Sequence, residues 1–271
     1  MKARTFLNLL KLVNTVNYLD VPIAVVDENL EIKTLDPTHV EYIRLTIPFS
    51  SFDSFKNDMS KEKRLLNVEL IVKNIKNCGK NDEVNIEAND ESFIIKIESP
   101  DNTEMHSFKF TDLEIDDEIP EPRLTFNSIN KIETKKLYEA LSKMRDYDNV
   151  KIISSNRKLI LKATSEIRTT ELVFTPITQE LLTDIVSAKY DLNRLYKVIS
   201  ILKNITDIIE VSYSTNKPLK LSVLDSEFSI IYYLAPLIDE NENEIDYVKE
   251  EYGDMIIVKH ADGKVRVKHK T

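Results

Sequence analysis

The stretch LEIKTLDPTHVEYIRLTIP, residues 30–48, decides the fold, because a second part of the chain repeats its arrangement. Residues 9–48 contain a helical pattern, a turn, LEIKTLD and an alternating strand that ends in YIRLTIP. Residues 137–176 contain a helical pattern, a polar turn, LILKATS and a strand that ends in TTELVFTP. Two blocks of equal length and equal order predict an internal repeat.

A second element recurs further along each copy. Residues 67–87, NVELIVKNIKNCGKNDEVNIE, and residues 191–213, DLNRLYKVISILKNITDIIEVSY, both indicate a helix followed by a strand. Hairpin-like strands follow, SFIIKIES and HSFKFTDL in the first copy and LKLSVL and FSIIYYLAP in the second. The sequence therefore predicts an α+β protein of two topologically similar domains, each with two helices on antiparallel sheets. The expected divisions are an N-terminal domain 1–111, a connector 112–126, a C-terminal domain 127–239 and an extension 240–271.

The composition argues against several classes of protein. The chain has 271 residues, 42% of them hydrophobic, but no run of about 18 apolar residues that would span a membrane. With 1 cysteine and 3 glycines, it has neither an internal disulfide nor a phosphate-cradling glycine loop. The 4 histidines lack an i, i+4 metal-type partner. We therefore expect a binding protein rather than an enzyme, with no metal and no cofactor. A reducing compartment fits: cytoplasmic in a prokaryotic, archaeal or viral host, or nuclear in a eukaryote.

The net charge of −9 is unevenly distributed. Four segments expected to form helices, residues 1–17, 61–80, 131–145 and 189–204, together sum to +13, which leaves −22 for the rest of the chain. A row of like charges repels itself and tends to persist where it meets a polyanion. Because no groove-reading motif accompanies them, these residues predict sequence-independent contacts with phosphates. The candidate DNA-binding residues are Lys11, Lys73, Lys76, Lys80, Lys136, Lys143, Arg145, Arg194, Lys197 and Lys203.

Periodicity places these charges on helix faces. In the second segment, Glu69, Lys73, Lys76 and Lys80 recur at steps of four, three and four, which predicts one face of a single α-helix. The first thirteen residues, MKARTFLNLLKLV, predict a strand followed by a helix. The alternative interpretation is that the lysines cover solvent-facing helix surfaces, as they do in many proteins.

Several motifs resemble the PCNA-type sliding clamps of archaea and eukaryotes. LDPTHVEYIRLTIP, residues 35–48, is similar to that family's Asp-x-x-His-Val turn and following strand, and YYLAPLID, residues 232–239, resembles its closing Tyr-Leu-Ala-Pro. VKNIKNCGKNDEVNIE, KPLKLSV and EIPEPRLTF resemble its second helix, its penultimate strand and its interdomain connector. The resemblance covers residue 1 to about residue 239. It implies the DNA-clamp fold, in which three chains close into a ring whose helices surround duplex DNA and whose sheets form the outer surface.

The resemblance also implies a function and partners. The protein would be a processivity factor that tethers DNA polymerase, flap nuclease and ligase, and an ATP-dependent clamp loader would load it. The implied partner-binding residues are Leu35, His39, Val40, Tyr42, Ile119, Pro120, Leu124, Phe126, Pro218, Tyr233, Leu234, Ala235, Pro236 and Ile238. Chain-to-chain contacts would use edge strands within residues 105–113 and 169–175.

The residues leave three points open. The extension has no counterpart in the family: residues 239–254 are strongly acidic, and disorder is most expected there, whereas MIIVKHADGKVRVKHKT, residues 255–271, predicts a β-hairpin. The extension could pack on the ring, bind a partner or contact DNA. The ring could contain three copies of this chain or different subunits. A clamp-fold scaffold that does not encircle DNA is the alternative function.

Overall fold

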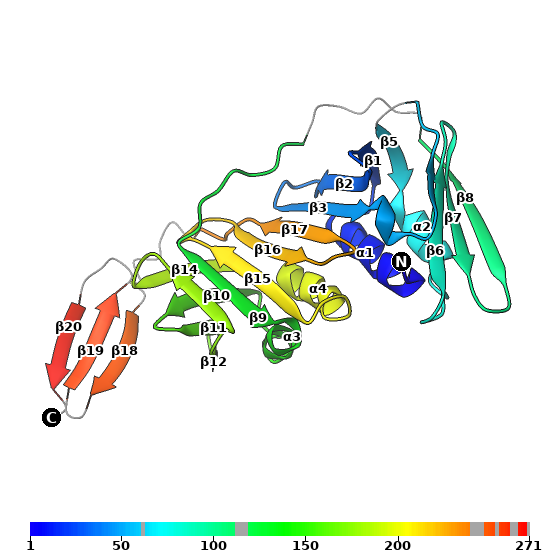
Figure 1. Ribbon diagram of the computed structural model, residues 1–271. Coiled ribbons are helices and arrows are strands. Elements are labelled where there is room, and N and C mark those ends of the chain that lie inside the picture. Colours follow the sequence, from blue (N-terminus) through cyan, green and yellow to red (C-terminus); the bar gives the residue numbers. More distant parts are fainter. Residues whose placement is uncertain (61–62, 112–118, 239–246, 253–254, 261–264, 270–271) are drawn as a thin grey trace. The chain divides into compact units, whose positions relative to one another are not determined.

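The structure is a computed structural model that describes residues 1–60, 63–111, 119–238, 247–252, 255–260 and 265–269. It forms two compact units, coloured along the chain in Figure 1. The first contains residues 1–122, 200–207 and 221–233, and the second contains residues 123–199, 208–220 and 234–271. The division after Pro122 falls inside the expected connector, residues 112–126. Among the described residues, no helix combines the length and hydropathy that crossing a bilayer requires.

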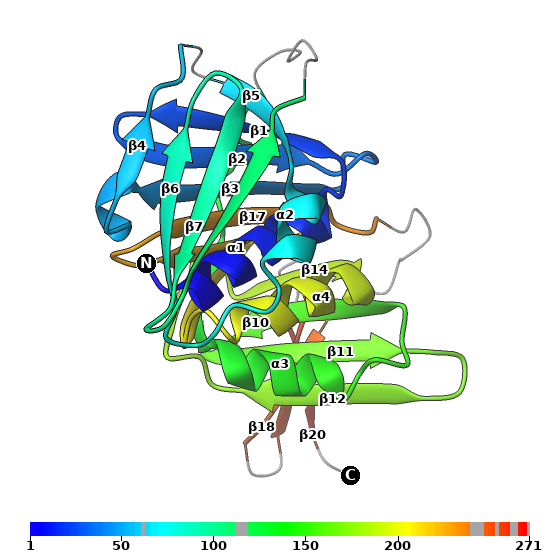
Figure 2. The same cartoon turned by 90° about the vertical axis from the view of Figure 1, so that its right-hand side faces the viewer.

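The first unit contains two helices and two sheets. Its elements are α1 (Ala3–Val16), β1 (Asp20–Val26), β2 (Asn29–Leu35), β3 (Glu41–Pro48), the 3-10 turn η1 (Phe49–Ser51), β4 (Phe55–Asn57), β5 (Lys63–Asn67), α2 (Val68–Asn74), β6 (Glu83–Ala88), β7 (Ser92–Glu98) and β8 (Thr103–Lys109). One sheet has the order β3-β2-β1-β5, and β17 (Ser229–Leu234) lies next to β3. The other has the order β4-β6-β7-β8, with β4 parallel to β6, and Figure 2 shows these strands side by side.

Helix α1 provides much of the core of the first unit. Phe6, Leu9, Leu10 and Val13 are buried at positions i, i+3, i+4 and i+7, which is the spacing of an amphipathic helix. The helix packs against α2, β2 and β3. Each of these side chains contributes about 1.5–3 kcal/mol on burial. The expected strand before α1 is wrong: α1 begins at Ala3, and only Lys2 forms a β-bridge, to Glu83.

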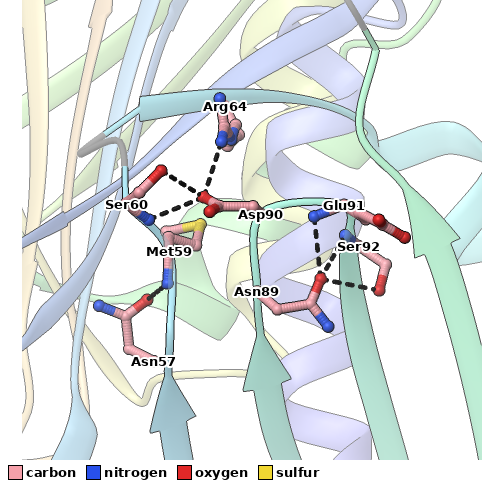
Figure 3. A network of polar contacts seen from close by, with 8 residues as sticks. All are labelled: Asn57, Met59, Ser60, Arg64, Asn89, Asp90, Glu91 and Ser92. Atoms are coloured by element: carbon pink, nitrogen blue, oxygen red, sulfur yellow. Dashed lines mark hydrogen bonds and ion pairs between the residues drawn. The ribbon is translucent and has the colours of Figure 1, made fainter.

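The turn between β6 and β7 holds a neighbouring segment in place. Asp90 Oδ1 accepts hydrogen bonds from the backbone N–H and hydroxyl of Ser60, both at 2.7 Å, and from Arg64 at 2.8 Å (Figure 3). Asn89 closes the turn by accepting from the backbone N–H groups of Glu91 and Ser92, both at 2.9 Å. The network therefore ties the segment after β4 to the β6–β7 hairpin.

The second unit repeats the pattern. Its elements are β9 (Ser128–Glu133), α3 (Thr134–Ser142), β10 (Asn149–Ser155), β11 (Lys158–Thr164), β12 (Thr169–Phe174), β13 (Thr178–Leu181), β14 (Ile185–Asp191), most of α4 (Leu192–Leu202), β15 (Ile208–Tyr213) and the start of β16 (Leu219–Leu224). One sheet has the order β12-β11-β10-β14, and β13, β9, β15 and β16 are consecutive neighbours in another. The order α1–β1–β2–β3 in the first unit matches the order α3–β10–β11–β12 in the second. Two neighbouring strands also follow the second helix of each copy: β6 and β7 follow α2, and β15 and β16 follow α4. The internal repeat is thus confirmed.

A buried hydrogen-bond network lies inside the second unit. Ser154 Oγ lies 2.7 Å from the hydroxyl of Tyr213 and accepts from Ser128 Oγ at 2.8 Å. The amide of Asn130 donates to Ser128 Oγ at 2.8 Å and accepts from Gln179 Nε2 at 2.8 Å. Because the first four side chains are almost fully buried, these bonds replace those that water would have made.

The expected helix lengths need correction. The second helix does not span residues 61–80: Lys63–Asn67 is strand β5, and α2 has 7 residues, Val68–Asn74. The Asn67 side chain begins the helix by accepting from Leu70 N–H at 2.8 Å. Asparagines at positions 74 and 77 favour its end, because their side chains compete for backbone hydrogen bonds. Lys76 and Lys80 therefore lie beyond the helix, not on one face of it.

The third and fourth helices are also shorter than expected. Lys131 belongs to β9 and Lys189 to β14. Lys143 is the C-cap of α3, Arg145 follows it, and Lys203 follows α4. In each case a strand runs directly into the helix, β9 into α3 and β14 into α4, so the charge pattern alone does not mark the boundary.

The extension forms a small antiparallel sheet of the order β18-β19-β20. Strands β19 (Met255–His260) and β20 (Val265–His269) pair antiparallel where the sequence predicts a hairpin, and residues 261–264 between them lie outside the described part of the chain. Within the acidic segment, where disorder is most expected, Tyr247–Tyr252 is strand β18 and pairs with β19. The adjoining residues 239–246 lie outside the described part of the chain, as do residues 112–118 of the connector.

Candidate nucleic-acid interface and partner pocket

The Asp-x-x-His-Val turn between β2 and β3 is held by a buried carboxylate. Asp36 Oδ1 accepts from the backbone N–H groups of Val40 and Glu41 at 2.6 and 2.7 Å, and Oδ2 accepts from the Thr38 hydroxyl. These bonds hold His39 at φ 58°, a left-handed conformation that only a few non-glycine residues adopt. The turn thereby presents the exposed His39 side chain outward, while Leu35 and Val40 are half-buried.

Beside this turn, the described end of the connector is fixed to the first unit. Arg44 on β3 forms ion pairs with Glu31 on β2 at 2.8 Å and with Glu121 at 3.1 Å. The Tyr233 hydroxyl donates to Glu121 Oε1 at 3.4 Å and to the carbonyl of Pro122 at 3.3 Å. The rings of Tyr42 and Tyr233 lie 5.8 Å apart. The structure thus brings together Tyr42, Tyr233 and the described end of the connector. No motif in the sequence pointed to Arg44 as the residue that holds them.

Burial and nearby charge keep both tyrosines protonated. Burial raises the pKa of Tyr233 to about 12, and the Glu121 carboxylate raises it as well. Burial also raises the pKa of Tyr42, as does Glu121, whereas Arg44 lowers it. The Tyr42 hydroxyl is buried and has no hydrogen-bond partner among the described residues. Of these two tyrosines, Tyr233 therefore has a hydroxyl with hydrogen-bond partners, and Tyr42 has one without a partner among the described residues.

The remaining pocket candidates differ in exposure. In the first unit, Ile119 is half-buried and Pro120 is exposed. In the second unit, Ile238 is exposed, whereas Leu234 is fully buried. Leu124, Phe126, Pro218, Ala235 and Pro236 are half-buried there. The backbone N–H of Leu237 donates to the carbonyl of Lys189 at 2.8 Å, which lays the end of YYLAPLID along β14. Leu234 cannot touch a partner directly, because no part of its side chain reaches the surface.

The candidate basic residues of the first unit fall into two groups. Lys73 forms an ion pair with Glu69 at 2.7 Å, and both side chains are exposed. Lys11, Lys76 and Lys80 make no ion pair with any residue that the structure describes. A neighbouring carboxylate cancels part of the field that a phosphate would feel. Lys11, Lys76 and Lys80 should therefore attract a polyanion more strongly than Lys73 does.

The candidate basic residues of the second unit also include a lysine with an ion pair and a lysine without one among the described residues. Lys136 forms an ion pair with Glu133 at 2.6 Å, whereas Lys143 makes none within the described residues. Arg194 is half-buried, and Lys197 is exposed on α4.

An aromatic pair, which the sequence did not reveal, lies beside these cations. The rings of Tyr138 on α3 and Tyr196 on α4 stack at 5.6 Å, and the guanidinium of Arg145 lies 5.0 Å from the Tyr196 ring centroid. A guanidinium over an aromatic ring is held in place by the cation–π interaction.

The two strands that the sequence predicted at sheet edges, β8 and β12, are the last strands of their sheets. β8 ends one sheet of the first unit, and β12 ends one sheet of the second. Met105 on β8 and Val173 on β12 are 67% and 51% exposed. The main-chain groups on the outer side of each strand are thus open to pairing with another strand.

Four α-helices and mainly antiparallel sheets among the described residues, in two copies of one topology, define the DNA-clamp fold. Residues 4–119 match the family model of the proliferating cell nuclear antigen (PCNA) N-terminal domain. The chain is 25% identical over 239 residues to the DNA polymerase sliding clamp of Thermofilum pendens, covering 86% of this chain and 93% of that protein.

Solved structures agree. PCNA from Thermococcus kodakaraensis superposes with a TM-score of 0.77 at 17% identity, over 88% of this chain and 98% of that one. A chain of the PCNA2–PCNA3 complex of Sulfolobus tokodaii superposes with a TM-score of 0.76 at 19% identity, over 87% of this chain and 97% of that one. The resemblance to the PCNA-type sliding clamps is therefore confirmed by the family model over residues 4–119, and the solved structures show the same fold over most of the chain.

Proposed function

We propose that this protein is a DNA sliding clamp, a non-catalytic processivity factor that encircles duplex DNA. The observation that carries the proposal is the clamp fold combined with positive charge at the helices of an acidic chain. Lysines that pair with no carboxylate among the described residues, such as Lys76 and Lys143, suit weak phosphate contacts that permit sliding. The same arrangement argues against a scaffold that no longer surrounds DNA, because a scaffold has no use for this charge.

Three chains would close the ring. Strand β8 of one chain would pair with β12 of the next, which is a head-to-tail interface. Such an interface gives a closed ring when the rotation that relates neighbouring chains divides a full turn evenly. Light scattering on the purified protein tests this directly. We expect the mass of three chains of 31.4 kDa each. A persistent monomer would contradict self-assembly and indicate a ring with other subunits.

DNA polymerase, flap nuclease, ligase and the clamp loader would dock at the connector. The residues proposed to contact these partners lie in the His39 turn, in the connector from Ile119 to Phe126 and in the segment from Tyr233 to Ile238. We propose the domain limits 1–111, 127–239 and 240–271 on either side of the connector 112–126. The protein would act in the cytoplasm, or in the nucleus of a eukaryote.

Polymerase stimulation separates the clamp from the scaffold. Lys76→Ala with Lys143→Ala removes two cations that have no ion-pair partner among the described residues. Lys63→Ala with Lys158→Ala removes the same charge from exposed positions on β5 and β11. We expect loader-dependent stimulation at moderate salt to fall severalfold in the first pair only. Equal stimulation by both variants and the parent protein would contradict DNA contact as the mechanism.

A further inference from the structure

The sheet of the extension has two open edges. Its order is β18-β19-β20, so β18 and β20 lie on its two sides (Figure 1). Both strands pair antiparallel with β19, and neither pairs with any other strand that the structure describes. The main-chain N–H and C=O groups on the outer side of an edge strand can pair with a further strand. The extension therefore offers two places where another strand can add.

The two edges have opposite charge. Strand β18 contains Glu250 and Glu251 and a single lysine. Strand β20 contains Arg266 and Lys268 and no carboxylate. Because β19 lies between them, the two edge strands are separated by two strand spacings, about 9.6 Å, and cannot pair with each other within one chain. Each edge can therefore add only a strand from elsewhere.

A second copy of the chain supplies the complement of each edge. Opposite charges on neighbouring strands attract and like charges directly opposite each other repel, so an acidic edge favours a basic strand and a basic edge favours an acidic one. Every copy carries one edge of each kind, so the β20 edge of one copy fits the β18 edge of another. Duplex DNA fits less well, because it offers no main-chain groups to a strand and the acidic residues 239–254 repel its phosphates.

We propose that β20 of one chain pairs with β18 of the next chain in the ring, so that the extensions form a subunit contact in addition to that of β8 with β12. The inference rests on the proposed ring of three chains. The contact is head-to-tail and is therefore compatible with the cyclic symmetry of such a ring. Since a rotation by a third of a turn cannot reverse the direction of a strand, the two edges pair in parallel. Extensions attached to one ring are held at a high effective concentration, so even a weak strand pairing contributes to closure.

Reversing the charge of the edges tests this contact. Arg266→Glu with Lys268→Glu makes both edges acidic, and this protein is the acidic-edge variant. Glu250→Lys with Glu251→Lys, added to those two changes, gives the swapped variant, in which β18 is basic and β20 is acidic. Light scattering over a dilution series measures the concentration at which half of the rings have dissociated. This concentration should rise about tenfold in the acidic-edge variant, because like charges replace opposite ones, and should return to the parent value in the swapped variant.

A matched control accompanies the acidic-edge variant. Lys63→Glu with Lys158→Glu reverses the same charge at exposed positions on β5 and β11. Its rings should dissociate at the same concentration as those of the parent protein.

Mixing the parent protein with the swapped variant separates a contact between chains from an effect within one chain. Both proteins have edges of opposite charge within each chain, but every mixed ring brings like-charged edges together. Native mass spectrometry should therefore find mixed rings several-fold below their statistical share.

The outcomes distinguish this inference from the proposed function. Statistical mixing, or an acidic-edge variant that dissociates like the control, overturns the extension contact, and the ring stands if the parent has the mass of three chains. A loss of affinity for a 30-base-pair duplex in the acidic-edge variant, with the ring as stable as in the parent, overturns it too and assigns the basic edge to DNA. If the parent protein itself stays a monomer, the proposed ring fails and the inference fails with it.

Discussion

Arg44 and Glu121 lie 77 residues apart in the sequence, and their side chains form an ion pair at 3.1 Å. This contact fixes the described end of the connector to β3, and the hydrogen bonds from Tyr233 to Glu121 and Pro122 reinforce it. The connector is thus more than a spacer, because its end is part of a polar cluster on the first unit. Its position beside the rings of Tyr42 and Tyr233 places it where a partner is proposed to dock.

Glu121→Gln tests the link between the connector and Tyr233. A carboxylate beside a phenol disfavours the tyrosinate, so removing the Glu121 charge should lower the pKa of Tyr233 from its value of about 12. A ¹³C NMR titration of the tyrosine ring carbons measures this. Glu69→Gln, which changes an exposed carboxylate on α2, should leave that titration as it is in the parent. An unchanged Tyr233 in Glu121→Gln would show that the contact does not persist in solution.

Tyr213 and Tyr42 are both buried, so removing the hydroxyl of each allows their contributions to the free energy of unfolding to be compared. Tyr213 is fully buried and its hydroxyl lies 2.7 Å from Ser154 Oγ, so Tyr213→Phe should cost about 1–3 kcal/mol by leaving the network unsatisfied. Tyr42 is 2% exposed, and its hydroxyl has no partner among the described residues. Tyr42→Phe should therefore be neutral or stabilise by up to about 1 kcal/mol. Urea unfolding distinguishes them, and equal costs for the two variants would contradict the hydrogen-bond assignment.

The ion pairs predict which lysines matter for DNA. Lys73→Ala with Lys136→Ala removes cations that Glu69 and Glu133 already neutralise in part. Lys76→Ala with Lys143→Ala removes cations without such partners in the described chain. We expect the second pair to make the salt slope of duplex binding shallower by up to about 2, and the first pair to change it by less. A larger effect of the first pair would contradict this ranking, and fluorescence anisotropy over a series of salt concentrations decides it.

The network of Figure 3 predicts a local dependence on pH. Hydrogen bonds from the Ser60 hydroxyl and backbone, with a further one from Arg64, lower the pKa of Asp90. Its contribution to stability is present above the ordinary aspartate pKa of about 3.9 and is lost as the pH falls through the lowered value. Ser60→Ala should raise the Asp90 pKa, as an NMR titration would show. Hydrogen exchange near residue 60 should then quicken at acid pH sooner than in the parent protein, and an unchanged Asp90 would contradict the network.

The repeat and the class of fold could be predicted from the sequence, because both follow from hydrophobic period and order. Helix limits could not, since strand β5 and helix α2 are joined at Asn67 without a break in the charge pattern. The residues of the partner surface followed from motifs, but the contact that orders it, Arg44 with Glu121, joins positions far apart in the chain. Long-range polar contacts depend on tertiary geometry, which periodicity does not encode.

Retention on DNA of different topology tests the central claim most directly. The protein is loaded by a clamp loader onto closed circular duplex DNA, free protein is removed, and a restriction enzyme then cuts the circle once. We predict that the protein stays on the intact circle for much longer than on the cut DNA, from which it slides off within the dead time of a gel-filtration column. Equal retention before and after cutting would contradict encirclement and, with it, the account of the helices as the DNA-facing surface.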